Sequence, residues 1–180
     1  SFLYPEKVDT CSLDLFKETR RIADEYDLLM ESHVSQSWVD FTEIMKRHGK
    51  TPIKYLYDLG IMKDDFISGH AIVVSGHSMT GYPDPWAEDI KILADTGTTV
   101  AHCPTPFVRY AIAMESYSKY LRMGVKIGLG TDTFPQDILN EMRTAAYLSK
   151  IKDSEPGVAT AKEVFDSATI KGANALKRPD

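Results

Sequence analysis

The sequence predicts an α/β protein with a parallel sheet, and three observations lead to this prediction. Short apolar stretches alternate with helical stretches along the whole chain. Each apolar stretch has the length of a strand rather than of a helix. Two of the helical stretches, over 12–27 and 35–49, have apolar residues on one helix face. Four strands separated by helices can form a small open sheet or half of an eight-stranded barrel, and periodicity alone does not separate these two.

In the first half of the chain, helix ends are indicated by capping residues. Ser35 and Thr51 are candidate N-caps, Pro52 suits the first turn of a helix, and glycine stops a helix. The expected elements are a helix over 12–27, a strand over 28–33, a helix from Ser35 to Gly49, a short helix from Thr51 to Gly60, and a strand over 66–74.

The second half continues the same alternation. Asp84 and Pro85 together form a cap and a first-turn proline, which predicts a helix that closes at Gly97. The remaining expected elements are a strand over 98–102, a helix over 114–123, a strand over 125–130, and helices over 137–152 and 161–176.

Composition excludes several functional classes. The chain has 180 residues, 43% of them hydrophobic, and a formal net charge of −5. That charge gives no basic surface for nucleic acid or an anionic membrane, and no apolar run approaches the roughly 20 residues of a membrane span. Two cysteines suggest no disulfide framework, so we expect a cytoplasmic protein. Because the chain lacks an initiator Met and ends just after a helical pattern, we expect it to be part of a longer one.

The four strands end on residues that chemistry uses: His33, His70, His102 and Asp132. In parallel α/β proteins the carboxyl ends of the strands build the active site, so these side chains are expected to share one mouth. Taken singly, each has a structural reading: a strand-end histidine is often only hydrogen-bonded, and Asp132 is a plausible cap. It is much less probable that all four residues stand at strand ends for structural reasons alone. Histidine and carboxylate are the ligand types of Zn²⁺ or Fe²⁺ sites.

The other candidate side chains are weighed individually. His48 lies late in a helix beside two basic residues and is read as a surface residue. His77 lies in a loop that should overhang the strand ends, where it can contact a substrate. Cys103 follows His102, but no base is evident for it, so we expect an inert thiol.

The motifs resemble the amidohydrolase superfamily, in particular the branch of chlorohydrolases and aminohydrolases that act on triazines, guanine and pterins. The resemblance rests on "SHVSQSWVDF", "ISGHAIVVSGHSM", "VAHCP" and "GLGTD" and covers nearly the whole chain. It implies a (β/α)8 barrel with a metal in its mouth. By motif, His33, His70 and Asp132 match three of the family's metal ligands, and His102 matches a histidine near the substrate.

The sequence departs from the family pattern in two ways. No His-x-His pair, the first-strand ligands of the family, occurs in these 180 residues. The chain therefore resembles the C-terminal half of the barrel, over residues 1–180, without the first four strands and the small β-sandwich; alone, we expect it to be inactive. Second, Gln36 stands three residues after His33, where ring deaminases of this branch usually carry a Glu that moves a proton.

These observations predict a metal-dependent hydrolase that attacks a C–N or C–Cl bond of a small nitrogen heterocycle. Zinc is the expected ion, with iron as the other possibility. Asp132 is expected to carry the proton and His102 to polarise the substrate, with Gln36, His77 and His102 in contact with it. A homo-oligomer is expected. The alternative is a non-catalytic half-barrel scaffold that self-associates, because unpaired barrel edges invite a second copy.

Overall fold

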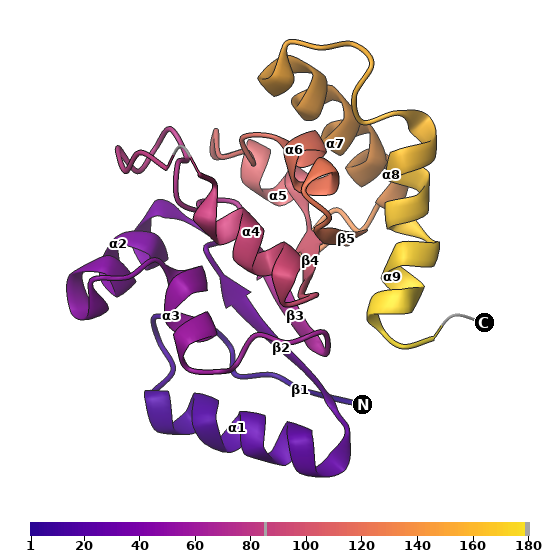
Figure 1. Cartoon of the computed structure of the whole chain (residues 1–180). Helices are drawn as coiled ribbons and strands as arrows, with labels where there is room; N and C mark the ends of the chain where they lie inside the picture. The colour runs from indigo at the N-terminus through magenta and orange to yellow at the C-terminus, as the bar shows by residue number, and fades with distance from the viewer. Residues whose placement is uncertain (85, 179–180) are drawn as a thin grey trace.

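The computed structural model describes residues 1–84 and 86–178, and its central feature is one sheet of five parallel strands in the order β1-β2-β3-β4-β5 (Figure 1). The strands are β1 (Phe2–Leu3), β2 (Leu29–Val34), β3 (Phe66–His70), β4 (Thr99–His102) and β5 (Lys126–Leu129). The predicted α/β class and the parallel direction are confirmed, and all four expected strands are present. Strand order equals chain order, as in a barrel.

The fifth strand, β1, is absent from the sequence-based expectation. Phe2 pairs with Leu29 and Leu3 with Met30, in parallel register. Two residues carry no measurable alternation, so pattern reading had no means of finding this strand. Its presence adds the segment around Tyr4 to the carboxyl end of the sheet.

Helices connect the strands. They are α1 (Leu13–Tyr26), α2 (Trp38–His48), α3 (Pro52–Asp58), α4 (Glu88–Asp95), α5 (Pro104–Val108), α6 (Tyr117–Arg122), α7 (Ile138–Asp153), α8 (Ala161–Ala168) and α9 (Ile170–Ala175). Ser12, Thr51 and Asp137 accept a hydrogen bond from a first-turn amide of α1, α3 and α7. The starts of these three helices therefore agree with the sequence, in which a capping residue lies directly before each helix.

The predicted cap of α2 is wrong by two residues. Ser37 is the N-cap, and it forms a capping box with the buried Asp40. Ser35 is instead fully buried in left-handed backbone at φ 54°, and its carbonyl accepts from the amides of Ile72 and Val73. Both serines fit a cap by sequence, and the hydrogen bonds from Ile72 and Val73 to Ser35 decide between them.

Strand β3 ends earlier than expected. The strand stops at His70, because His70 and Ala71 have φ values of 77° and 43° and turn the chain out of the sheet. Residues 71–74 are buried but not extended with the sheet. The sequence remains apolar from residue 71 to residue 74, and for this reason the strand was predicted to extend to residue 74.

Three helix predictions in the second half also need correction. Helix α4 begins at Glu88, not at Pro85, which lies outside the described residues, although Asp84 accepts from the amides of Trp86 and Glu88. The helix expected over 114–123 begins only after its cap, Ser116. The helix over 161–176 is broken at Thr169, and α5, directly after β4, was not predicted.

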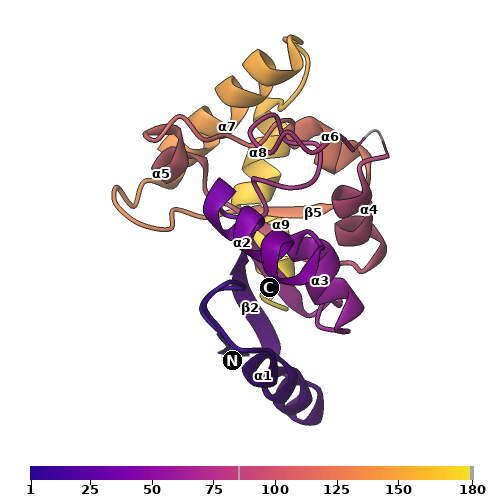
Figure 2. The ribbon, with the colours of Figure 1, turned by 90° about the vertical axis from the view of Figure 1, so that its left-hand side faces the viewer.

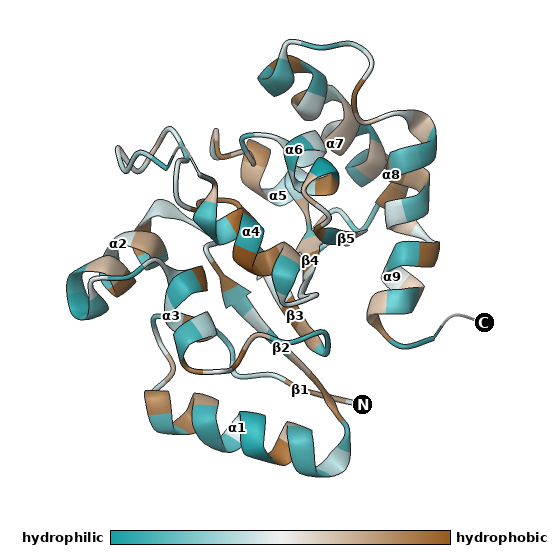
Figure 3. Ribbon diagram, in the orientation of Figure 1, coloured by the Kyte–Doolittle hydropathy of each residue, from teal (hydrophilic) through white to brown (hydrophobic). Residues whose placement is uncertain are grey.

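One face of the sheet packs against helices to form the core. The alternating residues Met30, Val34, Phe66, Val100 and Ile127 are buried in one cluster with apolar residues of α1 to α4. Helices α1 and α4 carry hydrophilic and hydrophobic residues together, as expected for half-buried helices (Figure 3). Burial of this face orients the other set of alternating residues away from the core.

The two edges of the sheet differ. Figures 1 and 2 place α2, α3 and α4 on one side of the sheet, with α8 and α9 on the other side of β5. The Cα of Gly172 in α9 lies 3.4 Å from the position of a Cβ on Gly128. Among the described residues, β1 and β5 each have one strand neighbour.

Within the same residues, no helix has the length and apolar character needed to cross a membrane.

A buried carboxylate holds the segment that follows β3. Asp89, 1% exposed, accepts from the Thr51 hydroxyl at 2.5 Å and from the Ser75 amide at 2.8 Å. It therefore joins the starts of α3 and α4 to the chain leaving His70. Burial raises the pKa of Asp89 from its ordinary 3.8 to about 6.

This raised pKa predicts a pH dependence of stability. The folded state retains the Asp89 proton more strongly than the unfolded state, so the stabilisation is complete below pH 4 and is lost as pH rises to about 6. The difference between 3.8 and about 6 corresponds to about 3 kcal/mol at most. We expect Asp89→Asn to flatten the fall in the free energy of unfolding between pH 4 and 6, measured by urea denaturation. The exposed neighbour Glu88 provides the control: Glu88→Gln should keep the fall, and an equal fall in both variants would contradict this assignment.

Candidate metal centre

Two of the predicted ligands lie side by side at the carboxyl ends of neighbouring strands. His33 is near the end of β2 and His70 is the last residue of β3. Their imidazole rings are stacked, with 5.0 Å between centroids and 14° between planes. Parallel register brings the ends of adjacent strands together, so residues 37 positions apart in the chain share one site.

Small residues keep the sheet open beside His33. The register aligns His33 with Gly69, Gly69 with Ala101, and Ala101 with Gly128 in one row across four strands. A Cβ on Gly69 would lie 3.3 Å from the Ser32 carbonyl oxygen and 3.5 Å from the His33 ring. Glycine at position 69 therefore avoids a tight contact with the Ser32 carbonyl beside His33.

His70 is a buried imidazole whose polar atoms are unpaired. Its side chain is 2% exposed, and neither ring nitrogen has a hydrogen-bond partner among the described residues. The ring of Phe107 meets it edge-on at 4.6 Å. Burial, and then the neighbouring His33, lower the pKa of His70 to about 3, so it is neutral at physiological pH. An unpaired buried polar group is costly, and a neutral imidazole is the form that binds a metal ion. The two histidines thus fit a divalent cation.

The backbone is strained at three of the strand ends. Ser35, His70 and Asp132 have φ values of 54°, 77° and 54°. Left-handed backbone costs about 1–2 kcal/mol for a residue other than glycine. Such outliers gather at functional sites, where the surrounding structure holds them. These three lie at or shortly after the ends of β2, β3 and β5, at the same end of the sheet as the two histidines, and seven other described non-glycine residues with positive φ lie elsewhere in the chain or next to His70.

Asp132 lies at this mouth but is not joined to the two histidines. Its residue is exposed and stands three positions after the end of β5. Burial raises the pKa of the Cys103 thiol to about 12, and the negative charge of Asp132 adds to this rise. Burial also raises the pKa of Tyr4, and Asp132 is one of the charges that contribute to it. Over residues 1–84 and 86–178, however, no group of three or more His, Cys, Asp or Glu side chains is arranged to hold an ion.

His102 is more deeply buried than expected for a side chain that meets a substrate. It is 3% exposed, and its ring lies 5.9 Å from that of Tyr117. Burial lowers its pKa to about 4, and its Nδ1 has no partner among the described residues. The neighbouring Cys103 is also buried, which agrees with the expected inert thiol. His102 therefore lies behind the mouth, with one nitrogen unpaired.

The predicted substrate contacts Gln36 and His77 have different surroundings. Gln36 is half-buried two residues after the end of β2, and its backbone amide donates to Asp40 at 3.0 Å. His77 is buried, with Nε2 2.9 Å from the Ala113 carbonyl and Nδ1 accepting from the Met79 amide at 3.1 Å. Both ring nitrogens of His77 are thus engaged within the loops. His48, read as a surface residue, is exposed.

Tyr4 is a residue of this site that pattern reading missed. It follows β1 directly, and its hydroxyl lies 2.7 Å from Nδ1 of His33. The only signal was its place after a strand too short to recognise.

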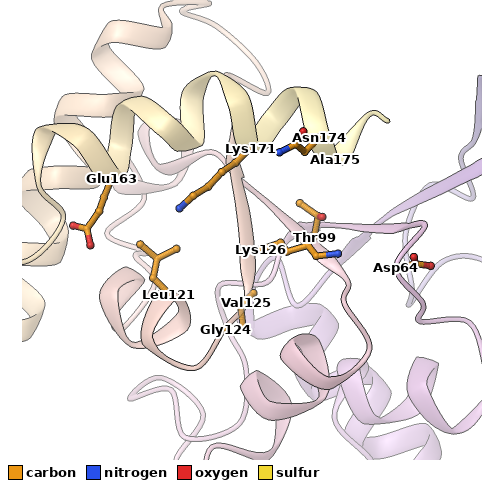
Figure 4. A pocket seen from close by; sticks show the side chains of 10 residues that line it. All are labelled: Asp64, Thr99, Leu121, Gly124, Val125, Lys126, Glu163, Lys171, Asn174 and Ala175. Carbon is orange, nitrogen blue, oxygen red and sulfur yellow. The ribbon is translucent and has the colours of Figure 1, made fainter. Parts of the chain in front are cut away.

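A separate cavity lies at the opposite end of the strands. It has a volume of about 450 Å³ and reaches Thr99 and Lys126, the first residues of β4 and β5 (Figure 4). Lys171 and Asn174 of α9 border it from the other side. Since His33 and His70 do not line it, this cavity is distinct from the candidate metal centre.

Comparison with known proteins gives a family. The model of the "Amidohydrolase family" matches residues 2–180. A 5-methylthioadenosine/S-adenosylhomocysteine deaminase of Thermococcus onnurineus is 38% identical over 176 residues, which are 96% of this chain and 39% of that protein. A 5'-deoxyadenosine deaminase of Methanothermobacter thermautotrophicus is 32% identical over 97% of this chain and 39% of its own length. The chain thus spans about two fifths of the length of these relatives.

Solved structures show the same architecture. An adenosine deaminase from Xanthomonas campestris with bound zinc superimposes with a TM-score of 0.85 at 24% identity, over 98% of this chain and 39% of that one. A mutant atrazine chlorohydrolase from Arthrobacter aurescens, in complex with zinc and atraton, gives 0.84 at 26% identity, over 99% and 38%. The first similarity supports the fold alone. The expected partial barrel agrees with both.

The unpaired state of His70 predicts an unusual response to mutation. In the metal-free protein we expect His70→Leu to raise the free energy of unfolding by about 1 kcal/mol, because an unsatisfied buried imidazole is replaced by an apolar side chain of similar size. The same variant should no longer be stabilised by added zinc. The exposed His48 is the control, and His48→Leu should change stability by less than about 0.5 kcal/mol. Thermal and urea unfolding measure both, and a marked loss of stability in metal-free His70→Leu would contradict this description.

Proposed function

This chain belongs to the amidohydrolase family, and we propose that the whole protein is a metal-dependent hydrolase acting on a C–N or C–Cl bond of a nitrogen heterocycle. One observation carries the proposal: the stacked pair His33 and His70, with both nitrogens of the buried His70 unpaired among the described residues. Relatives named as deaminases of adenosine derivatives and a structural neighbour named as a chlorohydrolase support the reaction class.

His33, His70 and Asp132 are the proposed metal ligands in this chain, with zinc as the ion and iron as the other candidate. Two structural neighbours were solved with zinc, which supports this choice. When bound, such an ion acts as a Lewis acid and lowers the pKa of a coordinated water to near 7. The two imidazoles supply neutral nitrogen donors, and Asp132 supplies the oxygen donor type that such sites combine with them.

The remaining polar residues have proposed roles around the substrate. Asp132, exposed at the mouth, accepts a proton during attack and returns it to the leaving group. Gln36 offers both a donor and an acceptor, which suits the alternating ring atoms of a nitrogen heterocycle. His102 hydrogen-bonds the substrate through its unpaired nitrogen, which requires a small rearrangement at the mouth. His77 acts at the rim, through the loop that its ring nitrogens hold in place.

We further propose that the chain is the C-terminal half of the barrel and is inactive by itself. It spans 39% of the length of its relatives, and its histidines and Asp132 follow the order of the family motifs. His33, His70 and Asp132 match three of the ligands of the family pattern, and the first-strand His-x-His pair does not occur in these 180 residues, so upstream strands would supply it. The whole protein, as a cytoplasmic homo-oligomer, is the form in which activity is expected.

The rival function is a scaffold that self-associates through its open strand edges. The single strand neighbours of β1 and β5 among the described residues favour it. A scaffold has no use for a buried histidine whose nitrogens are unpaired, and that residue costs stability unless something binds it. We therefore favour the enzyme.

The test uses the full-length protein, stripped with a chelator and reloaded with zinc or iron. Ammonia release from 5'-methylthioadenosine, 5'-deoxyadenosine and adenosine, and chloride release from atrazine, are measured in parallel. We expect one of them with metal and none without it. We expect Asp132→Asn to lower kcat/KM by about 100- to 10,000-fold. Metal-independent behaviour, or an Asp132→Asn variant that retains metal and full turnover, would overturn the proposal, and a metal-free dimer without activity would favour the scaffold.

Position 36 allows a prediction about the leaving group. Gln36→Glu restores a carboxylate able to move a proton, so we expect ammonia release from an aminopurine to rise about tenfold or more. Chloride needs no proton to leave, so its release should not gain. Gln136→Glu adds the same charge at an exposed position after β5 and serves as the control. Equal ammonia release by Gln36→Glu and wild type would show that Asp132 and water already supply that proton.

A further inference from the structure

We propose that Phe107 is a positioning residue of the metal centre: its ring fixes the orientation of the His70 imidazole, and Glu141 of α7 holds Phe107 in that place. The inference rests on the proposed metal-dependent function and adds two residues to it. Neither residue is among the predicted ligands or substrate contacts.

The two histidines of the centre are oriented by different means. The Glu6 carbonyl oxygen lies 2.8 Å from Nδ1 of His33. Because a carbonyl can only accept, this contact is favourable when Nδ1 carries the proton, which leaves the electron pair of Nε2 for an ion. Metal-binding histidines are usually held by such a bond from their second ring nitrogen. His70 has none, since both of its ring nitrogens are unpaired among the described residues, so its orientation depends on packing.

Two aromatic rings contact the His70 imidazole. The His33 ring is stacked on it, with 5.0 Å between centroids and 14° between planes. The Phe107 ring lies 4.6 Å away between centroids, at an angle of 63° to the imidazole plane. Contacts with rings in two different planes restrain the imidazole more than stacking alone, because turning it about either side-chain torsion alters at least one of them.

The start of α5 determines where Phe107 lies, and its hydrogen-bonding needs are unusual. Residues 104–106 read Pro-Thr-Pro, so Thr105 has the only backbone N–H among the first three helical positions. The N-cap residue Cys103 makes no side-chain cap bond. Because Thr105 is buried, its amide needs an acceptor from another part of the fold.

Helix α7 supplies that acceptor. A carboxylate oxygen of Glu141 accepts from the Thr105 amide at 2.9 Å. The Thr105 hydroxyl donates to the Thr144 hydroxyl at 3.1 Å and accepts from the Asn140 side-chain amide at 3.2 Å. Helix α5 lies beside α7 in Figures 1 and 2. One residue of α5, two positions before Phe107, is thus held by three residues of α7.

The burial of Glu141 supports a role beyond the packing of α7. Its side chain is fully buried, and its other carboxylate oxygen, Oε1, has no partner among the described residues. A buried carboxyl group with an unpaired oxygen lowers stability, and the bond to Thr105 offsets only part of that loss. The contact with α5 is therefore the feature that accounts for a glutamate at this position.

The first experiment measures the zinc affinity of full-length variants by competition with a chromophoric chelator, at a temperature at which they are folded. Phe107→Leu keeps an apolar side chain and removes the ring, and we expect affinity to fall about 10- to 100-fold, as for other residues that orient a metal ligand. Glu141→Ala should lower affinity in the same direction. Glu141→Gln keeps a carbonyl oxygen for the Thr105 amide and should bind zinc nearly as wild type does.

The matched control is Phe165→Leu, at an exposed phenylalanine of α8, which should bind zinc as wild type does. Wild-type affinity in Phe107→Leu would overturn the proposal. Equal losses in Glu141→Gln and Glu141→Ala would overturn the role of Glu141. Phe107→Leu leaves the contacts between Thr105 and α7 in place, so it tests the proposal even where Glu141→Ala does not fold.

The second experiment needs no metal and separates this inference from the proposed function. The metal-free, full-length protein is labelled with carbon-13 in its histidine rings, and the His70 resonance is assigned by its loss in His70→Leu. Since the ring current of Phe107 shifts this resonance, we expect Phe107→Leu and Glu141→Ala to move it and Glu141→Gln to leave it in place. An unmoved His70 resonance in Glu141→Ala would overturn the role of Glu141. A wild type that shows the expected shifts among its variants but binds no zinc would contradict the proposed function and leave the positioning of His70 intact.

Discussion

The stacking of two imidazoles at the ends of adjacent parallel strands is the constraint on which the rest of the site depends. His33 and His70 lie 5.0 Å apart only because β2 and β3 pair in a register that sets His33 beside Gly69. A Cβ at position 69 would lie 3.3 Å from the Ser32 carbonyl oxygen, which is a tight contact. The pair is therefore a product of strand register, and it brings two imidazoles side by side at the carboxyl end of the sheet.

The placement of His70 at this site is energetically unfavourable in itself. Left-handed backbone at His70 and the unpaired nitrogens of its ring both disfavour the folded state in the absence of a ligand. Compensation comes from the surroundings: the Ser35 carbonyl accepts from two amides after β3, and Asp89 fixes the chain a few residues further on. Unfavourable backbone and unpaired polar atoms at the strand ends are thus accompanied by hydrogen bonds that fix the neighbouring segments, as is usual around a functional site.

Sequence reasoning reached the parts of this molecule that are encoded locally. Strand positions, the cap Thr51, the starts of the helices near residues 12 and 137, and the placement of His33 and His70 at strand ends all follow from short patterns. What it missed depends on partners distant in the chain. Strand β1 is defined only by pairing with β2, Ser35 is distinguished from Ser37 by bonds to residues 72 and 73, and Tyr4 meets His33 across 29 positions. For the same reason the relation of Asp132 to the histidines could not be read from motif order, and in the described residues its carboxylate is not gathered with them.

The most direct test of this account is the location of the ion in crystals of the zinc-loaded, full-length protein, by anomalous scattering on both sides of the zinc absorption edge. The account predicts one strong peak at bonding distance, about 2.0–2.1 Å, from Nε2 of His33 and from a ring nitrogen of His70. A peak bound to other residues, with the two imidazoles still stacked and unligated, would contradict it.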